Sequence, residues 1–201
     1  MQTINEDIKN GTFKPVYLLY GEEAFLKQSY KKKLRAAISG DDTMNYNYFE
    51  GKGLDVNELI SLADTMPFFS ERRLILIEDS GFFKNANQQL AEYIPSIPEE
   101  TIMLFVESEV DKRGKLYKAV SKKGSVVEFT AQNEQTLTRW ILGILKTEGK
   151  MITSGAMKQF LEKTGTDMER IRQELEKLIC FTMGRDVVTD EDVEEICAAQ
   201  A

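Results

Sequence analysis

Short apolar runs that alternate with helical segments constrain the fold of this chain more than any other feature of its sequence. The run from Val16 to Tyr20 is apolar at every position. A continuous run of this length is typical of a strand that is buried on both faces, as in a parallel sheet. The runs Leu74 to Ile77 and Ile102 to Val106 have the same character, and weaker strands are predicted at 45–50 and 126–129. Together these runs predict five strands.

Helical patterns precede and separate the five predicted strands. Residues 22–39 keep apolar side chains at helical spacing, and Glu22 and Glu23 suit the positive end of the helix dipole. Further helices are predicted around Ile4 and Ile8 with Gly11 as the end, over 56–66 with Asp55 as the cap, over 85–93 and over 112–123. Strands that alternate with helices imply right-handed crossovers. The sequence therefore predicts an α/β fold, a parallel five-stranded sheet with helices on both faces.

The pattern changes near residue 132, where helices alone are predicted. They cover 134–147, 154–164, 167–181 and a last segment that begins after Thr189. Thr189, with Asp192 three residues later, is a variant of the capping box. No strand is predicted after Thr130. We therefore expect two domains, an α/β domain over 1–132 and a small helical domain over 133–201.

The absence of histidine excludes several kinds of active site. Because none of the 201 residues is histidine, Ser/His/Asp triads, Cys/His dyads and histidine metal sites are impossible, and we expect no metal site. Cys180 and Cys197 both fall on predicted apolar helix faces. That placement favours buried free thiols in a reducing cytoplasm, although one disulfide bridge would also fit the sequence.

Charge and hydropathy indicate a cytoplasmic protein. The 26 basic and 33 acidic residues give a net charge of −7, so no global attraction to nucleic acid is expected. No apolar run approaches the ~20 residues that a membrane helix requires, and the first residues lack an export signal. We expect no membrane association.

The segment after the first predicted strand lies where a P-loop would bind phosphate. Its sequence, GEEAFLKQ over residues 21–28, departs from the G-x-x-x-x-G-K-[ST] pattern. Leu26 replaces the glycine that lets the backbone approach the phosphates, and Gln28 replaces the hydroxyl that holds magnesium. We expect a degenerate phosphate loop that binds no nucleotide cofactor. In the plainest interpretation, Gly21 simply ends a strand and Lys27 is a solvated helix residue.

Two acidic residues follow the strand predicted at 74–77. Glu78 and Asp79 resemble the acidic end of a Walker B strand, with the two acids in reversed order. Without a phosphate cradle there is little for magnesium to bridge, so we expect these acids to mark the exit of a buried strand into solvent. No catalytic residue is predicted.

Two adjacent phenylalanines follow the helix predicted at 56–66. That helix should stop at Pro67, which cannot continue its hydrogen bonding, and Phe68 and Phe69 come next. Neighbouring side chains in an extended segment point to opposite sides, so at least one ring should be exposed. Exposed aromatic rings with charged neighbours have the composition of a protein-binding hot spot. In the plainer alternative, one ring packs beneath the helix and the other has no role.

Four short segments match one known family in order and in spacing. They are Val16 to Glu23, Phe68 to Ile75, Asp111 to Lys118, and Glu174 to Leu178. Together they resemble the delta subunit of the bacterial DNA polymerase III clamp loader. Each match is weak alone, but the joint match across nearly the whole chain is specific.

The resemblance implies a AAA+-like domain that has lost its ATP site, followed by a small helical lid domain. It also implies a role, that of a non-catalytic subunit of the DNA-directed DNA polymerase holoenzyme, a nucleotidyltransferase complex. In the family, delta binds and opens the sliding clamp during DNA replication by means of a hydrophobic plug. That plug corresponds to Phe68 and Phe69, with Met66 beside it. Clamp-binding segments often carry a glutamine upstream of the plug, where this chain has Asp64.

The partners that the resemblance implies are the sliding clamp and the other clamp-loader subunits. Family members carry a third, helical domain that assembles the loader, and the sequence ends at Ala201 before such a domain. We therefore expect this chain to correspond to the first two domains of a delta subunit.

Two basic clusters are candidates for contact with DNA or with a partner subunit. The residues singled out in them are Lys31, Lys32, Lys33, Lys112 and Arg113. A solvated or partner-facing role is favoured, with DNA contact that is weak or confined to the assembled loader. Two other functions also fit the sequence, an active P-loop ATPase or nucleotide kinase with a divergent loop, and a two-domain DNA-binding adaptor.

Overall fold

A parallel sheet of five strands forms the centre of the first part of the chain, in a computed structural model that describes residues 1–85 and 87–197. The strands are β1 (Val16–Tyr20), β2 (Tyr46–Glu50), β3 (Arg73–Glu78), β4 (Thr101–Glu107) and β5 (Ser125–Glu128). Their order across the sheet is β2-β3-β4-β1-β5, and every neighbouring pair is parallel. The predicted five-stranded parallel sheet is thus confirmed.

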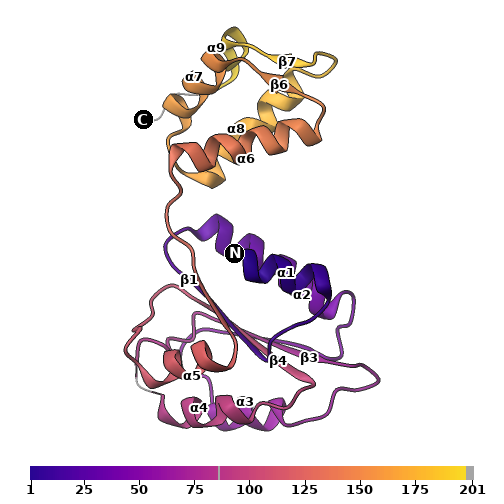
Figure 1. Cartoon of the computed structure of the whole chain (residues 1–201), viewed down its shortest axis with the longest axis vertical. Coiled ribbons are helices and arrows are strands. Elements are labelled where there is room, and N and C mark those ends of the chain that lie inside the picture. The colour runs from indigo at the N-terminus through magenta and orange to yellow at the C-terminus, as the bar shows by residue number, and fades with distance from the viewer. Residues whose placement is uncertain (86, 198–201) are drawn as a thin grey trace. The chain divides into compact units, whose positions relative to one another are not determined.

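Helices cover both faces of this sheet. One face carries α1 (Gln2–Asn10) and α2 (Ala24–Ser39), and the other carries α3 (Val56–Ala63), α4 (Gln88–Tyr93), a short 3-10 turn (Ile94–Ser96) and α5 (Lys115–Lys123) (Figure 1). Alternate residues of β1 enter opposite clusters of buried side chains. Leu18 packs with the α3, α4 and α5 side, and Leu19 with the α1 and α2 side. This double burial explains why the strand is apolar at every position.

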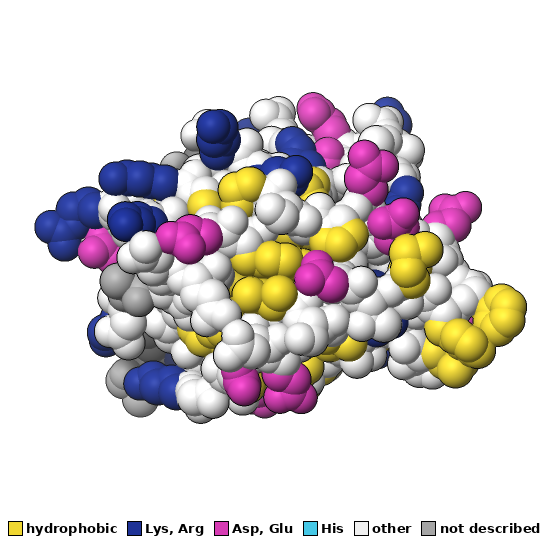
Figure 2. Space-filling view, turned by 90° about the horizontal axis from the view of Figure 1, so that it is seen from below, with side chains coloured by type: hydrophobic (Ala, Val, Ile, Leu, Met, Phe, Trp, Pro, Cys, Tyr) yellow, Lys and Arg dark blue, Asp and Glu magenta, His cyan; other side chains and the backbone are white. Residues whose placement is uncertain are grey.

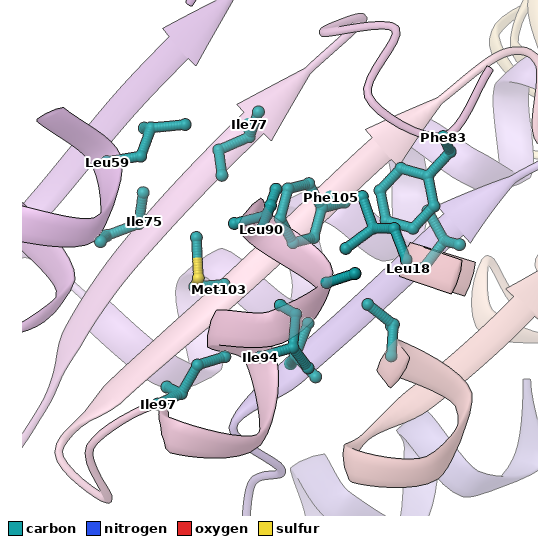
Figure 3. Close-up of a cluster of buried hydrophobic side chains, with 14 of the residues drawn as sticks. Leu18, Leu59, Ile75, Ile77, Phe83, Leu90, Ile94, Ile97, Met103 and Phe105 are labelled. Carbon is teal, nitrogen blue, oxygen red and sulfur yellow. The ribbon is translucent and has the colours of Figure 1, made fainter. Parts of the chain in front are cut away.

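The larger cluster lies between β1, β3, β4 and the helices α3 and α4 (Figure 3). Phe83 and Phe105 meet there edge to face, with ring centroids 5.1 Å apart. Ile75 and Met103 point from adjacent strands toward Leu59 and Ile94 in the same view. The apolar side chains of this cluster fix α3, and therefore the segment that follows α3, against the sheet.

Several predicted helix boundaries differ from the structure. The predicted helix 56–66 ends at Ala63, because Pro67 disfavours helical geometry at the preceding residue and the chain unwinds before it. Helix α4 begins after Asn87, whose side chain accepts a hydrogen bond from the Leu90 N–H, so it starts three residues later than predicted. Residue 86 of that prediction lies outside the described residues. Helix α5 also begins three residues late, at Lys115.

The second part of the chain contains the four predicted helices and two short strands. The helices are α6 (Glu134–Thr147), α7 (Ser154–Thr164), α8 (Met168–Phe181) and α9 (Asp190–Ile196). Thr189 and Asp192 form the predicted capping box at the start of α9. The prediction of no strand after Thr130 is wrong, because β6 (Met151–Ile152) and β7 (Val187–Val188) pair in parallel. Strands of two residues are too short to leave an alternating pattern in the sequence.

The two cysteines lie in different environments. Both are free thiols, and Cys197 is buried as predicted, with burial raising its pKa to about 11. Cys180 is exposed, which contradicts the prediction of two buried side chains, because it lies off the buried face of α8 that Ile171, Leu175 and Leu178 form. Among the helices of residues 1–85 and 87–197, none is long and apolar enough to cross a membrane.

The chain divides into two compact units, residues 1–130 and 131–201.

We predict that limited proteolysis with a protease of broad specificity first cuts between residues 130 and 135, where Thr130, Ala131 and Asn133 are exposed. Mass spectrometry of the first fragments checks this prediction. Early cleavage inside β3 or β4, which are buried along their whole length, would contradict it.

Candidate functional site

The loop between β1 and α2 is too short to wrap around a phosphate. Strand β1 ends at Tyr20 and α2 begins at Ala24. The backbone N–H of Phe25, at the start of the helix, donates a hydrogen bond to the Glu23 carboxylate, 3.2 Å away. A carboxylate of the protein itself therefore occupies a helix N-terminus where a P-loop would bind a phosphate oxygen.

Lys27 is buried rather than solvated, so the plainest interpretation of its sequence position is wrong. Its ammonium donates to the carbonyl oxygens of Gly21 at 3.0 Å and Glu107 at 3.1 Å. These carbonyls follow the carboxyl end of β1 and close β4, two neighbouring strands. A lysine that binds phosphate in a working P-loop thus serves here as a bridge between two strand ends.

Gly21 allows the end of β5 to close over the same loop. Its φ of 115° lies in the region that glycine favours, and a Cβ at this position would overlap the carbonyl oxygen of Phe129. Phe129 donates its N–H to the Tyr20 carbonyl at 2.7 Å and accepts from the Glu23 N–H at 3.0 Å. Leu26, one turn into α2, is half-buried and packs against the apolar cluster on that face of the sheet.

Glu78, at the end of β3, is also buried, which contradicts the expectation that it leads the strand into solvent. Its carboxylate accepts hydrogen bonds from Gln28 at 2.7 Å and from the Tyr48 hydroxyl at 3.0 Å. Lys31 donates to both carboxylate oxygens, at 3.0 and 2.8 Å. Burial alone would raise the pKa of Glu78, but the hydrogen bonds from Lys31 and Gln28 outweigh it and hold the pKa below its usual value.

These contacts engage the residues at the P-loop hydroxyl and Walker B positions with groups of the protein itself. Gln28, which stands where a P-loop has its hydroxyl, is engaged by Glu78, and the acid of the Walker B position is neutralised by Lys31. Asp79 is exposed as expected and accepts a hydrogen bond from the Ser108 hydroxyl at 3.0 Å. Within residues 1–85 and 87–197, no group of three or more Cys, Asp or Glu side chains could hold a metal ion.

The segment from Asp64 to Arg72, between α3 and β3, carries a group of exposed apolar side chains. Met66 is 72% exposed, Phe68 55% and Phe69 95%. Figure 2 shows hydrophobic side chains that project from one edge of the molecule. Exposure of a side chain as large and apolar as Phe69 does not stabilise an isolated monomer. A group of such exposed apolar side chains is the usual sign of an interaction surface.

The two phenylalanine rings lie against each other instead of pointing to opposite sides. Their centroids are 4.4 Å apart and the ring planes meet at 76°. The predicted extended geometry is wrong because Phe69 has a φ of 49°, in the left-handed region. This turn of the backbone brings the second ring beside the first, so both are presented as one surface.

Residues that the sequence did not single out hold this segment in place. The Arg73 guanidinium is buried and donates to the carbonyl oxygens of Thr65 and Met66, both at 3.3 Å, and to the Asn47 side chain at 2.9 Å. Asn45 binds the backbone of Phe68. Asparagine and arginine at the start of a strand give no signal of such a role in the sequence alone.

Asp64, the residue at the position where clamp-binding segments often have glutamine, has a contact of its own. Its carboxylate accepts a hydrogen bond from the Tyr93 hydroxyl at 2.6 Å, and burial together with this bond raises the pKa of Tyr93. The residue also ends α3 by donating its N–H to the Ile60 carbonyl. Asp64 therefore ties the start of the segment to α4.

The five basic residues singled out in the sequence have different surroundings. Lys31 pairs with the buried Glu78, Lys112 with Glu128 at 2.6 Å, and Arg113 with Asp111 at 3.1 Å. Lys32 and Lys33 have exposed side chains on α2, and the Lys33 ammonium lies 4.8 Å from the Tyr30 ring centroid. Three of the five are therefore paired with acidic residues of the protein itself.

The strand order and the position of the degenerate phosphate loop define a AAA+-like fold. A RuvB variant from Thermotoga maritima superposes on 97% of this chain and 65% of its own with a TM-score of 0.56, at 13% identity, which supports the fold alone. The DNA clamp loader delta protein of Bacillus subtilis superposes on 99% of this chain and 62% of its own, with a TM-score of 0.74 and 27% identity.

Residues 17–130 match the family DNA polymerase III, delta subunit, and the chain belongs to that family. The DNA polymerase III subunit delta of Bacillus subtilis is 28% identical over 96% of this chain. The alignment covers 59% of that relative, so the chain spans little more than half of the relative's length.

We predict that the chain shows no saturable binding of ATP. Lys27 is held by two carbonyls, and the half-buried Leu26 stands where a P-loop has its second glycine, so neither position can serve a phosphate. Equilibrium binding of labelled ATP with magnesium at micromolar concentration checks this prediction, with an active P-loop ATPase as the positive control. Saturable binding that the Lys27→Ala variant abolishes would overturn it.

The buried carboxylate of Glu78 should contribute stability that depends on pH. Because its folded-state pKa lies below the unfolded value of 4.5, the contribution is present above that pH and is lost as the pH falls through the folded pKa. We expect Glu78→Gln to lower the free energy of unfolding by about 2–3 kcal/mol near neutral pH, because it leaves the Lys31 ammonium without its counter-charge.

Urea unfolding of both proteins between about pH 7 and about pH 3 measures this effect, and the difference between them should shrink toward the acid end. Glu58→Gln, a change of an exposed glutamate on α3, is the control and should show little difference at any pH. A Glu78→Gln difference that stays constant over this range would contradict the prediction.

Proposed function

We propose that this chain is a non-catalytic clamp-loader subunit that binds and opens the sliding clamp during DNA replication in the cytoplasm. The proposal combines its membership of the delta family with one structural observation. That observation is the pair of exposed rings, Phe68 and Phe69, held side by side on the segment after α3. In this proposal the rings are the plug that enters an apolar pocket on the clamp, with Met66 beside them.

The shape of the segment supports a role in binding. Two rings at 4.4 Å form one apolar surface, and the backbone on either side of Pro67 is hydrogen-bonded to the sheet through Arg73 and Asn45. A rigid segment of this kind loses little conformational entropy when it binds. Aromatic anchors in a desolvated pocket commonly contribute most of the energy of a protein interface.

A role without catalysis agrees with the contacts at the carboxyl ends of the strands, at the other edge of the sheet from Phe68 and Phe69. Lys27, Glu23 and Glu78, which stand at or near the P-loop and Walker B positions, are all engaged by the protein's own groups. An active P-loop ATPase would need the lysine, the Walker B acid and the helix N-terminus that Glu23 caps to be free to meet phosphate or magnesium. The work of clamp opening would then come from binding energy and from the ATPase subunits of the loader, which we propose as the further partners.

Contact with DNA is proposed only within the assembled loader. Lys32 and Lys33 are exposed on α2, and α5 carries further exposed lysines at Lys115, Lys118, Lys122 and Lys123. Against a net charge of −7, these helix faces would attract phosphate only when other subunits hold DNA nearby. A DNA affinity of this chain alone that falls steeply with salt would favour the DNA-binding adaptor instead.

The test of the clamp proposal is the affinity of the Phe68→Ala/Phe69→Ala variant for the sliding clamp of the same cell. Loss of both rings should weaken binding by about 3–5 kcal/mol, which is a factor of roughly 150 to several thousand. The melting temperature should stay nearly unchanged, because Phe68 and Phe69 are 55% and 95% exposed and neither ring belongs to the buried core.

Two control variants separate binding from stability. Phe105→Ala removes a fully buried ring and should cost about 3–5 kcal/mol of folding stability. Phe181→Ala/Met183→Ala removes exposed apolar side chains from the second unit and should leave clamp affinity as in the wild type. If the Phe68→Ala/Phe69→Ala variant binds the clamp normally, the plug lies elsewhere. If it melts at a much lower temperature, the rings belong to the core.

A further inference from the structure

The side-chain amide of Asn45 holds the backbone of Phe68 by two hydrogen bonds. The amide oxygen accepts from the Phe68 N–H at 2.6 Å, and the amide nitrogen donates to the Phe68 carbonyl at 2.9 Å. This pairing resembles one rung of a sheet, with a side chain in place of the second strand. It spans 23 residues of sequence and connects the start of β2 to the segment between α3 and β3.

The position and the orientation of the Asn45 side chain are themselves fixed. Its side chain is 2% exposed, and its backbone carbonyl accepts a hydrogen bond from the Leu74 N–H in the sheet. The Asp42 carboxylate accepts from the Asn45 amide nitrogen at 2.8 Å and from the Asn45 backbone N–H at 3.0 Å. These bonds hold the pKa of Asp42 below its usual value and require the amide oxygen to face Phe68.

The other side of Pro67 is held by Arg73, which binds the carbonyls of Thr65 and Met66. Pro67 has a fixed φ and no N–H to donate. The chain from Thr65 to Phe68 is therefore anchored at both ends before it turns through the left-handed conformation of Phe69. The ring of Phe69 has almost no core to pack on, so the direction in which it points depends on this backbone.

We propose that Asn45 is a positioning residue that holds Phe68 and Phe69 in the geometry in which they meet the clamp. The inference rests on the proposed clamp-binding role of the two rings and adds how their presentation is achieved. Without the amide, Phe68 would lose both backbone partners and the left-handed turn at Phe69 would compete with other conformations. The segment would then have to become ordered during binding, which weakens the complex although both rings are still present.

The experiment compares Asn45→Ala with the wild type in two measurements on the whole chain. Hydrogen exchange of the Phe68 amide should be much faster in the variant, because the acceptor of that N–H is gone. Affinity for the sliding clamp should fall by about tenfold, the order expected when a preorganised segment becomes mobile. Asn57→Ala, which changes an exposed asparagine at the far end of α3, is the matched control and should alter neither quantity.

A double-mutant cycle tests whether Asn45 acts through the rings. In the Phe68→Ala/Phe69→Ala background, Asn45→Ala should cause no further loss of affinity. An equal loss in both backgrounds would overturn the inference, since Asn45 would then act on clamp binding by another route. Asn45→Asp keeps the size of the side chain and the acceptor for the Phe68 N–H, but loses the donor and places a second carboxylate beside Asp42. The clamp affinity of Asn45→Asp should lie between those of the wild type and Asn45→Ala.

The outcomes distinguish this inference from the proposed function. If removal of the two rings leaves clamp affinity unchanged, the proposed function fails. If it weakens binding while Asn45→Ala changes neither affinity nor the exchange of the Phe68 amide, only the positioning role is wrong. Global unfolding of both Asn45→Ala and Asn45→Asp, seen by circular dichroism, would also overturn the inference, because Asn45 would then support the core.

Discussion

Burial of the central strands on both faces is the constraint on which the rest of the structure depends. Strands β1, β3 and β4 are buried along their whole length, between α1 and α2 on one face and α3, α4 and α5 on the other. Because all five strands are parallel, every carboxyl end lies at one edge of the sheet and every amino end at the other. The loops at these two edges therefore form two separate surfaces.

The carboxyl edge is where a P-loop protein has its nucleotide site. In this chain the polar groups at that edge bind one another. Lys27 bridges the ends of β1 and β4, and Glu78 is bound by Lys31, Gln28 and Tyr48. Glu107 accepts hydrogen bonds from Ser80, and burial raises its pKa. Buried charges of this kind are stable only when they are paired, and here the partners are groups of the protein itself. In our proposal this edge is structural.

The amino edge carries the exposed rings, since β3 begins at Arg73 directly after their segment. Arg73 and Asn45 lie at the starts of neighbouring strands, β3 and β2, and both bind the backbone of the segment. The sheet therefore supports the proposed plug directly, without any path through the degenerate phosphate loop. In our proposal the surface of Phe68 and Phe69 is therefore exposed whether or not a nucleotide is present. At the carboxyl edge, the residues of the P-loop and Walker B positions are bound by other side chains and carbonyls of the protein.

The sequence by itself determined the fold class, the order of its elements and the loss of the phosphate loop. Continuous apolar runs specify buried parallel strands at any position in a fold, and Leu26 and Gln28 are incompatible with P-loop chemistry wherever the loop lies. Adjacent large rings after Pro67 likewise indicated a surface feature, although the extended backbone assumed for that prediction is not the one that the structure shows.

Only the tertiary structure decided what the polar residues do. Lys27 and Glu78 have ordinary sequence contexts for solvated residues. Both are buried and partnered, Lys27 by the end of β4, 80 positions away, and Glu78 by Lys31 of α2, 47 positions away. The side-by-side rings go with a left-handed conformation at Phe69, and an amide 23 positions before Phe68 binds the Phe68 backbone. Hydrogen bonds between distant residues leave no periodic pattern in a sequence, whereas the burial of a strand or a helix face does.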